Sequence, residues 1–165
     1  MSGAQTGVWN FLRESKGYNV QELPISAEGD TTVTFYAEDN VGNLEQSRSQ
    51  VVRIDETPPT ITGLPSGCEL WPPNNQLVHV ADVFARDGLS GLGADALLVT
   101  ASSNDLSDAG DIVISGGSVA LRAAKTKQGA TRVYGVRATA TDEAGNATIG
   151  SATCLVPHSQ GQSTK

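Results

Sequence analysis

The chain is poor in aromatic residues and cysteines and has no long apolar run. Aromatic residues make up 5 % of its 165 residues, so glycine, with 18 copies, outnumbers them. This balance favours short strands and turns over long helices. No apolar run approaches the length that a transmembrane helix needs, so the sequence predicts no membrane span. No signal peptide is visible either, but the chain can be a piece of a longer one, so this does not indicate a cytosolic protein.

Basic residues are in the minority, which argues against a nucleic-acid partner. The net charge is −7, and an acidic protein repels phosphate backbones. One stretch without acidic residues carries the bases Arg122, Lys125, Lys127, Arg132 and Arg137. We interpret this stretch as the solvated face of a hairpin, and the alternative is a surface that binds a polyanion.

The two cysteines, Cys68 and Cys154, stand near the start and the end of the second part of the chain. The first and last strands of a β-sandwich often lie close together, so we predict a disulfide between them. Two buried free thiols are the alternative. A disulfide would indicate an oxidising compartment.

A short phrase occurs twice in the chain. Residues 33–43 read VTFYAEDNVGN, and residues 136–146 read VRATATDEAGN. In both, apolar residues at every second position lead into Asp-x-x-Gly-Asn, which predicts a half-buried strand and a tight turn. The repetition indicates two copies of one β-module. The motif positions are Asp39, Gly42, Asn43, Asp142, Gly145 and Asn146.

A proline-rich stretch around Pro58 and Pro59 separates the two copies and predicts a short, semi-rigid link. We therefore expect a partial β-sandwich over residues 1–57, a full one over residues 58–158 and a disordered tail over residues 159–165. A sandwich normally needs about seven strands and near 100 residues. The first module thus lacks its opening strands: either the chain starts inside a domain, or another chain supplies the missing edge.

The residues also resemble a known family. Residues 26–61 are similar to the second half of a bacterial immunoglobulin-like repeat of large secreted and cell-surface proteins. Residues 68–161 resemble a related module through LWPPNNQLVHV, the DGLSG loop and RVYGVRATATDEAGN, although Asn75 stands where the family usually has histidine. The resemblance implies an all-β fold of tandem immunoglobulin-like, Greek-key sandwiches. It also implies a non-catalytic module beside catalytic or adhesive domains.

Carboxylates in the turns raise the question of calcium. Asp142 and its counterpart Asp39 can close their turns through hydrogen bonds to the backbone, and this accounts for the motif. The alternative is that loops at one end of a sandwich gather oxygen ligands for Ca²⁺, which would then be the cofactor of the chain. The candidate ligands are Asp87, Asp105, Asp142 and Asn146, with Asp108 as an addition.

Nothing in the sequence indicates catalysis. It has no HExxH, P-loop, CxxC or G-x-S-x-G motif. His79 and Asp82 are three residues apart on an expected strand, so they should point to opposite faces and form no dyad. Trp71 is interpreted as a core residue, with a sugar-stacking role as the alternative, and Trp9 is a second such candidate. A ligand site would use Trp71, Arg122 and Arg132.

The sequence therefore predicts a non-catalytic spacer, stalk or adhesive module pair of a secreted or cell-surface bacterial protein. Its partners would be neighbouring domains of the same or identical chains. One alternative is a carbohydrate-binding module, with glycans as partners. Another is a subunit that assembles when a second copy donates a strand to the incomplete first module.

Overall fold

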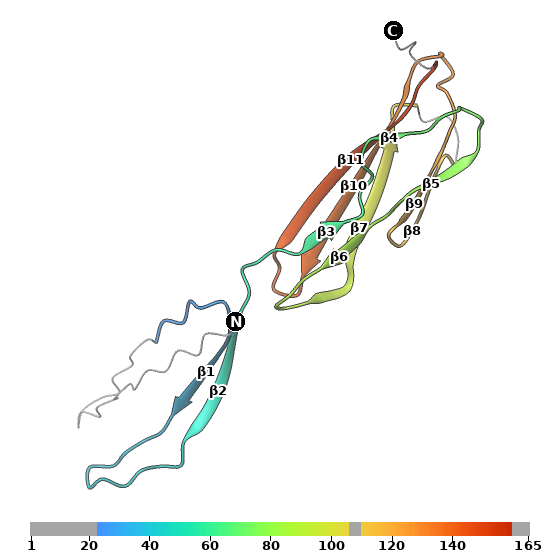
Figure 1. Cartoon of the computed structure of the whole chain (residues 1–165). Coiled ribbons are helices and arrows are strands. Elements are labelled where there is room, and N and C mark those ends of the chain that lie inside the picture. The colour runs from blue at the N-terminus through green and yellow to red at the C-terminus, as the bar shows by residue number, and fades with distance from the viewer. Residues whose placement is uncertain (1–22, 106–109, 160–165) are drawn as a thin grey trace. The chain divides into compact units, whose positions relative to one another are not determined.

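The computed structural model describes residues 23–105 and 110–159, and strands and turns make up these ranges (Figure 1). Within them there is no helix, so the prediction of an all-β chain is confirmed. The chain divides into two compact units, Met1–Glu56 and Thr57–Lys165. This division lies one residue before the expected boundary. All but the first residue of the predicted tail lies outside the described ranges.

In the first unit, the described residues form one antiparallel hairpin. It consists of β1 (Gly29–Phe35) and β2 (Arg48–Ile54), paired from Gly29 opposite Ile54 to Phe35 opposite Arg48. Large apolar side chains are exposed on this hairpin and its loop: Phe35, Tyr36, Val41, Leu44 and Val51. The completion of this unit by another chain stays a prediction.

The second unit contains a four-stranded sheet in the order β4 (Cys68–Glu69), β11 (Ala147–Val156), β10 (Arg132–Asp142) and β7 (Leu92–Ser103) (Figure 1). Alternate residues of the central strand β10 are buried, since each strand turns successive side chains to opposite faces. Tyr134, Val136, Ala138 and Ala140 are all at most 1 % exposed. The alternation read from the sequence therefore places the core correctly.

Two further sheets complete the second unit. One has the order β5 (Leu77–Asp82), β9 (Ser118–Arg122) and β8 (Ile112–Ser115), and the other pairs β3 (Thr60–Thr62) with β6 (Phe84–Arg86). Val119 and Leu121 of β9 belong to the same buried cluster as Tyr134 and Val136 of β10. Apolar faces from different sheets thus share one core, which is consistent with a β-sandwich.

A β-bulge in β5 makes one prediction wrong. His79 lies opposite Ala120 and Ala81 opposite Val119, so β5 has one extra residue at this point. The extra residue shifts the alternation by one position. His79 and Asp82 therefore share a face, and their Nε2 and Oδ1 atoms lie 2.9 Å apart. The expectation that they point to opposite faces holds only for a regular strand.

The predicted disulfide between Cys68 and Cys154 is confirmed, with an S–S distance of 2.01 Å. The two cysteines are direct neighbours in the parallel pair of β4 and β11. Cys154 is fully buried. The bond therefore joins adjacent strands of one sheet, across a sequence separation of 86 residues.

Candidate functional site

The two Asp-x-x-Gly-Asn turns make the same hydrogen bonds. In the first, Oδ1 of Asp39 accepts from the backbone N–H of Asn43 at 2.9 Å, and Oδ2 accepts from its side-chain amide at 2.7 Å. In the second, Asp142 accepts from Asn146 in the same way, at 2.7 and 2.9 Å. These bonds account for the aspartate and asparagine of the motif.

The glycine of each motif has a backbone role. Gly42 and Gly145 adopt φ values of 90° and 95°, a region that glycine enters without the steric cost of a Cβ. Each of them also donates its N–H to the carbonyl of the motif aspartate, at 3.1 Å to Asp39 and 3.3 Å to Asp142. All three fixed positions of the motif therefore build the turn.

The second turn packs against the loop that begins at Asp87. Oδ1 of Asp87 accepts from the backbone N–H groups of Leu89 and Gly91, and the Gly91 carbonyl accepts from the N–H of Glu143. Carboxylate oxygens of Asp87 and Asp142 lie within 4.8 Å of each other. Two predicted metal ligands are thus neighbours at one end of the second unit.

The four predicted calcium ligands do not form a single cluster. Asp142 lies opposite Leu92 at the start of β7, whereas Asp105 follows Ser103 at the end of that twelve-residue strand. Oδ2 of Asp105 instead accepts from the backbone N–H of Lys127 at 3.0 Å. Asp108 lies outside the described residues. Ca²⁺ takes six to eight oxygen ligands, and the side chains of Asp87, Asp142 and Asn146 supply only part of such a set. Calcium binding at these residues therefore stays a prediction.

The second unit has a buried ionic network centred on Asp111. Oδ2 of Asp111 accepts from the guanidinium of Arg132 at 2.7 Å, and Oδ1 accepts from Arg122 at 2.7 Å. Asp111 and Arg132 are 4 % and 1 % exposed. Arg132 also donates to the Ser103 hydroxyl and to the Asp105 carbonyl. Both arginines are therefore committed to the fold.

This network corrects two interpretations of the basic stretch. It is not a uniform solvated face, because Arg132 is buried, and Arg122 donates to the carbonyls of Asn75 and Gly110 as well as to Asp111. Arg132 is too buried to reach a ligand, whereas the Arg122 side chain is 35 % exposed, so a role for Arg122 in ligand binding stays a prediction. Lys125, Lys127 and Arg137 are exposed, as expected for the stretch.

Sequence reasoning missed Asp111, although a signal was present. Arg132 is in phase with Tyr134 and Val136, so the alternation of β10 already placed its side chain inward. A charge in that position requires a buried partner of opposite charge. Tyr134 lies in the same environment: its ring centroid is 4.8 Å from the Arg132 guanidinium carbon, and its hydroxyl donates to the Arg122 carbonyl. Burial raises the pKa of the Tyr134 hydroxyl.

The pair of His79 and Asp82 lies on the surface, with about half of each side chain exposed. The hydrogen bond from His79 is the main cause that lowers the pKa of Asp82 below the usual range, and Ser118 adds a smaller hydrogen bond. The ionised carboxylate of Asp82 accepts the hydrogen bond from His79. Because both side chains are exposed, this pair contributes little to the free energy of unfolding.

We expect the His79→Ala substitution to raise the pKa of Asp82 toward the usual range of an aspartate. Because the folded-state pKa is lowered, the pair stabilises the fold above the usual aspartate range, and this contribution is lost as the pH falls through the folded-state pKa. Carbon-detected NMR titration of the carboxyl group measures the shift. The internal control is Asp39, whose pKa is lowered chiefly by the Asn43 backbone N–H and should not change. An Asp82 titration unchanged by the substitution would refute the role of His79.

Trp71 is 40 % exposed, so the interpretation of this residue as a core residue is wrong. Leu70, its neighbour, is 4 % exposed and occupies the core instead. An exposed aromatic ring is compatible with a sugar-stacking role, and carbohydrate binding through Trp71 stays a prediction. Trp9 lies outside the described residues.

No protein-family model, curated protein or solved structure matches the chain. What the chain does must therefore be inferred from its own strands and side chains. Over residues 23–105 and 110–159, no helix has the length and hydrophobicity that crossing a bilayer requires.

Proposed function

We propose that the chain is a non-catalytic, load-transmitting spacer of an extracellular or cell-surface protein, built from tandem immunoglobulin-like β-modules. The observation that carries this proposal is the disulfide between β4 and the last strand, β11. Tension that enters at residue 57 and leaves after residue 156 passes from β4 to β11 through this covalent bond. The strands between Cys68 and Cys154 then bear little of the force.

The use of the polar side chains supports the same proposal. Asp111, Arg122 and Arg132 form an internal network, and Asp39 and Asp142 close turns. Among the described residues, every buried side-chain nitrogen or oxygen has a hydrogen-bond partner. Such residues stabilise the fold, and this is what a structural module requires. A disulfide also forms most readily outside the cytosol, which supports an extracellular setting.

Single-molecule stretching of the chain from its two ends tests the proposal. With the disulfide intact, the second unit should lengthen only by the residues outside the bridged segment. Reduction should allow the segment between the two cysteines, which are 86 residues apart in the sequence, to extend as well. Because an extended chain spans at most about 3.3–3.6 Å per residue, the released length should be about 300 Å.

The double substitution Cys68→Ala/Cys154→Ala is the control for reduction and should lengthen fully without any reductant. An oxidised chain that extends as far as the reduced one would contradict the proposal, because the bond would then not carry the tension.

A further inference from the structure

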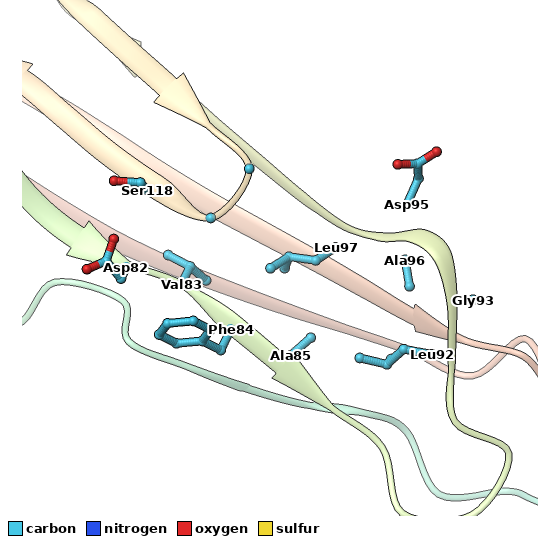
Figure 2. Close-up of a pocket in the computed structure, with 12 residues that line it drawn as sticks. Asp82, Val83, Phe84, Ala85, Leu92, Gly93, Asp95, Ala96, Leu97 and Ser118 are labelled. Carbon is cyan, nitrogen blue, oxygen red and sulfur yellow. The ribbon is translucent and has the colours of Figure 1, made fainter.

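An open groove of about 460 Å³ lies on the second unit, and its lining does not include Asp87, Asp142 or Asn146. Its walls come from the end of β5, the start of β6, the first half of β7 and the turn between β8 and β9 (Figure 2). Val83, Ala85 and Leu97 supply apolar surface between the two ends. Figure 2 shows Asp82 and Ser118 at one end and Asp95 at the other.

One wall of the groove belongs to an irregular part of the terminal strand β7. Leu92 lies opposite Asp142 and Leu97 opposite Ala140, so the ladder between β7 and β10 skips residues 93–96. Within residues 23–105 and 110–159, β7 is the terminal strand of its sheet, so no further strand pairs with its other side. The skipped segment includes Asp95 at φ 60°, a left-handed conformation that aspartate tolerates better than most residues. As a terminal strand, β7 can offer backbone N–H and C=O groups along its outer edge to an added extended chain.

The rim of the groove has an exposed aromatic ring. Phe84 is 59 % exposed although its neighbour Val83 is 1 % exposed. A ring with this much free apolar surface gains stability when a partner side chain covers it.

The charges at the groove are of one sign. The ionisable lining residues in the described part of the chain are Asp82 and Asp95, and the side chain of Glu143 lies beside Gly93. His79, which lies on β5 like Asp82, is hydrogen-bonded to it. Arg86, the base on β6, is not part of the lining. Complementary charge favours a cationic partner at both ends.

We propose that this groove binds an extended segment of a partner protein that carries lysine or arginine. The segment pairs its main chain with the outer edge of β7 beside the groove, covers Phe84 with an apolar side chain and places its bases near Asp82 and Asp95. This goes beyond the spacer function, because it gives the second unit a specific docking point that is independent of the Cys68–Cys154 bond.

A peptide of alternating lysine and valine is the probe, titrated into the full ¹⁵N-labelled chain. We expect saturable amide shifts at residues 82–85, 92–97 and 116–118. Because each exposed charge pair contributes modestly, the substitution Asp82→Asn/Asp95→Asn should weaken binding about tenfold. Phe84→Ala should also weaken it, by several fold. The matched control is Asp30→Asn on β1, an exposed carboxylate of the first unit, which should leave the affinity unchanged.

Two more peptides separate strand pairing from simple charge attraction. An N-methylated lysine–valine peptide keeps its charge but loses main-chain donors, and it should bind at least several-fold more weakly. A glutamate–valine peptide should not bind. The absence of saturable shifts in the groove, or equal binding by either control peptide, would overturn the proposal. Binding that is insensitive to both groove substitutions would overturn it as well.

Discussion

Replacing Asp111 with alanine is expected to destabilise the second unit by about 3–5 kcal/mol, because it leaves the buried guanidinium of Arg132 without its counter-charge. Arg132 is 1 % exposed and cannot reach water without disturbing the strands around it. Its remaining partners, the Ser103 hydroxyl and the Asp105 carbonyl, are neutral. Urea denaturation of the full chain, followed by circular dichroism, measures the loss as a lower midpoint for the transition of this unit.

The matched control is Arg122→Ala, which removes the other base from the same carboxylate. The Arg122 side chain is 35 % exposed, and Asp111 keeps Arg132 as a partner. The loss should therefore be smaller, at about 1–2 kcal/mol, the range of a partly exposed charged hydrogen bond. Equal losses for the two variants would show that Arg132 does not depend on Asp111.

Loss of the Cys68–Cys154 bond is expected to cost about 4–5 kcal/mol, which the chain-entropy model gives for a closed loop of this length. The sequence separation is 86 residues, so the bond removes much of the freedom of the unfolded chain. Denaturation of the oxidised chain, the reduced chain and the Cys68→Ala/Cys154→Ala variant measures the effect.

Comparing reduction with substitution identifies the source of that loss. Reduction keeps both sulfur atoms in place, whereas the alanine variant also leaves a small cavity at Cys154, which is fully buried. The alanine variant should therefore be somewhat less stable than the reduced chain. A reduced chain within 1 kcal/mol of the oxidised one would contradict the entropic explanation.

Strands with regular alternation could be predicted closely from the sequence. The apolar pattern on either side of the second Asp-x-x-Gly-Asn turn predicts one strand over residues 132–141 and another over residues 147–156. The second coincides with β11, and the first is one residue shorter than β10. These strands lie in the middle of a sheet, where one face is buried and the pattern of apolar residues is strict. The pairing of the two cysteines followed from the closeness of first and last strands.

Features that depend on a partner strand could not be predicted in the same way. The bulge in β5 exists only relative to β9, so the sequence around His79 gives no local sign of it. The segment of β7 that β10 skips is likewise a property of the pair. For Arg132, the alternation was informative, but grouping it with neighbouring bases by charge hid its inward orientation.

The disulfide lies within one sheet, and this separates the roles of covalent and apolar contacts. It joins β4 to β11 and does not cross the core. Apart from the continuity of the chain, the layer formed by β5, β9 and β8 is held to the four-stranded sheet by noncovalent contacts. These are a shared apolar cluster that includes Val119, Leu121 and Val136, the ion pair of Asp111 with Arg132, and the hydrogen bond from the Tyr134 hydroxyl to the Arg122 carbonyl. Conditions that weaken apolar contacts can therefore separate the two layers while the disulfide still holds β4 beside β11. The bond fixes one edge of the larger sheet, and noncovalent contacts determine whether the layers remain together.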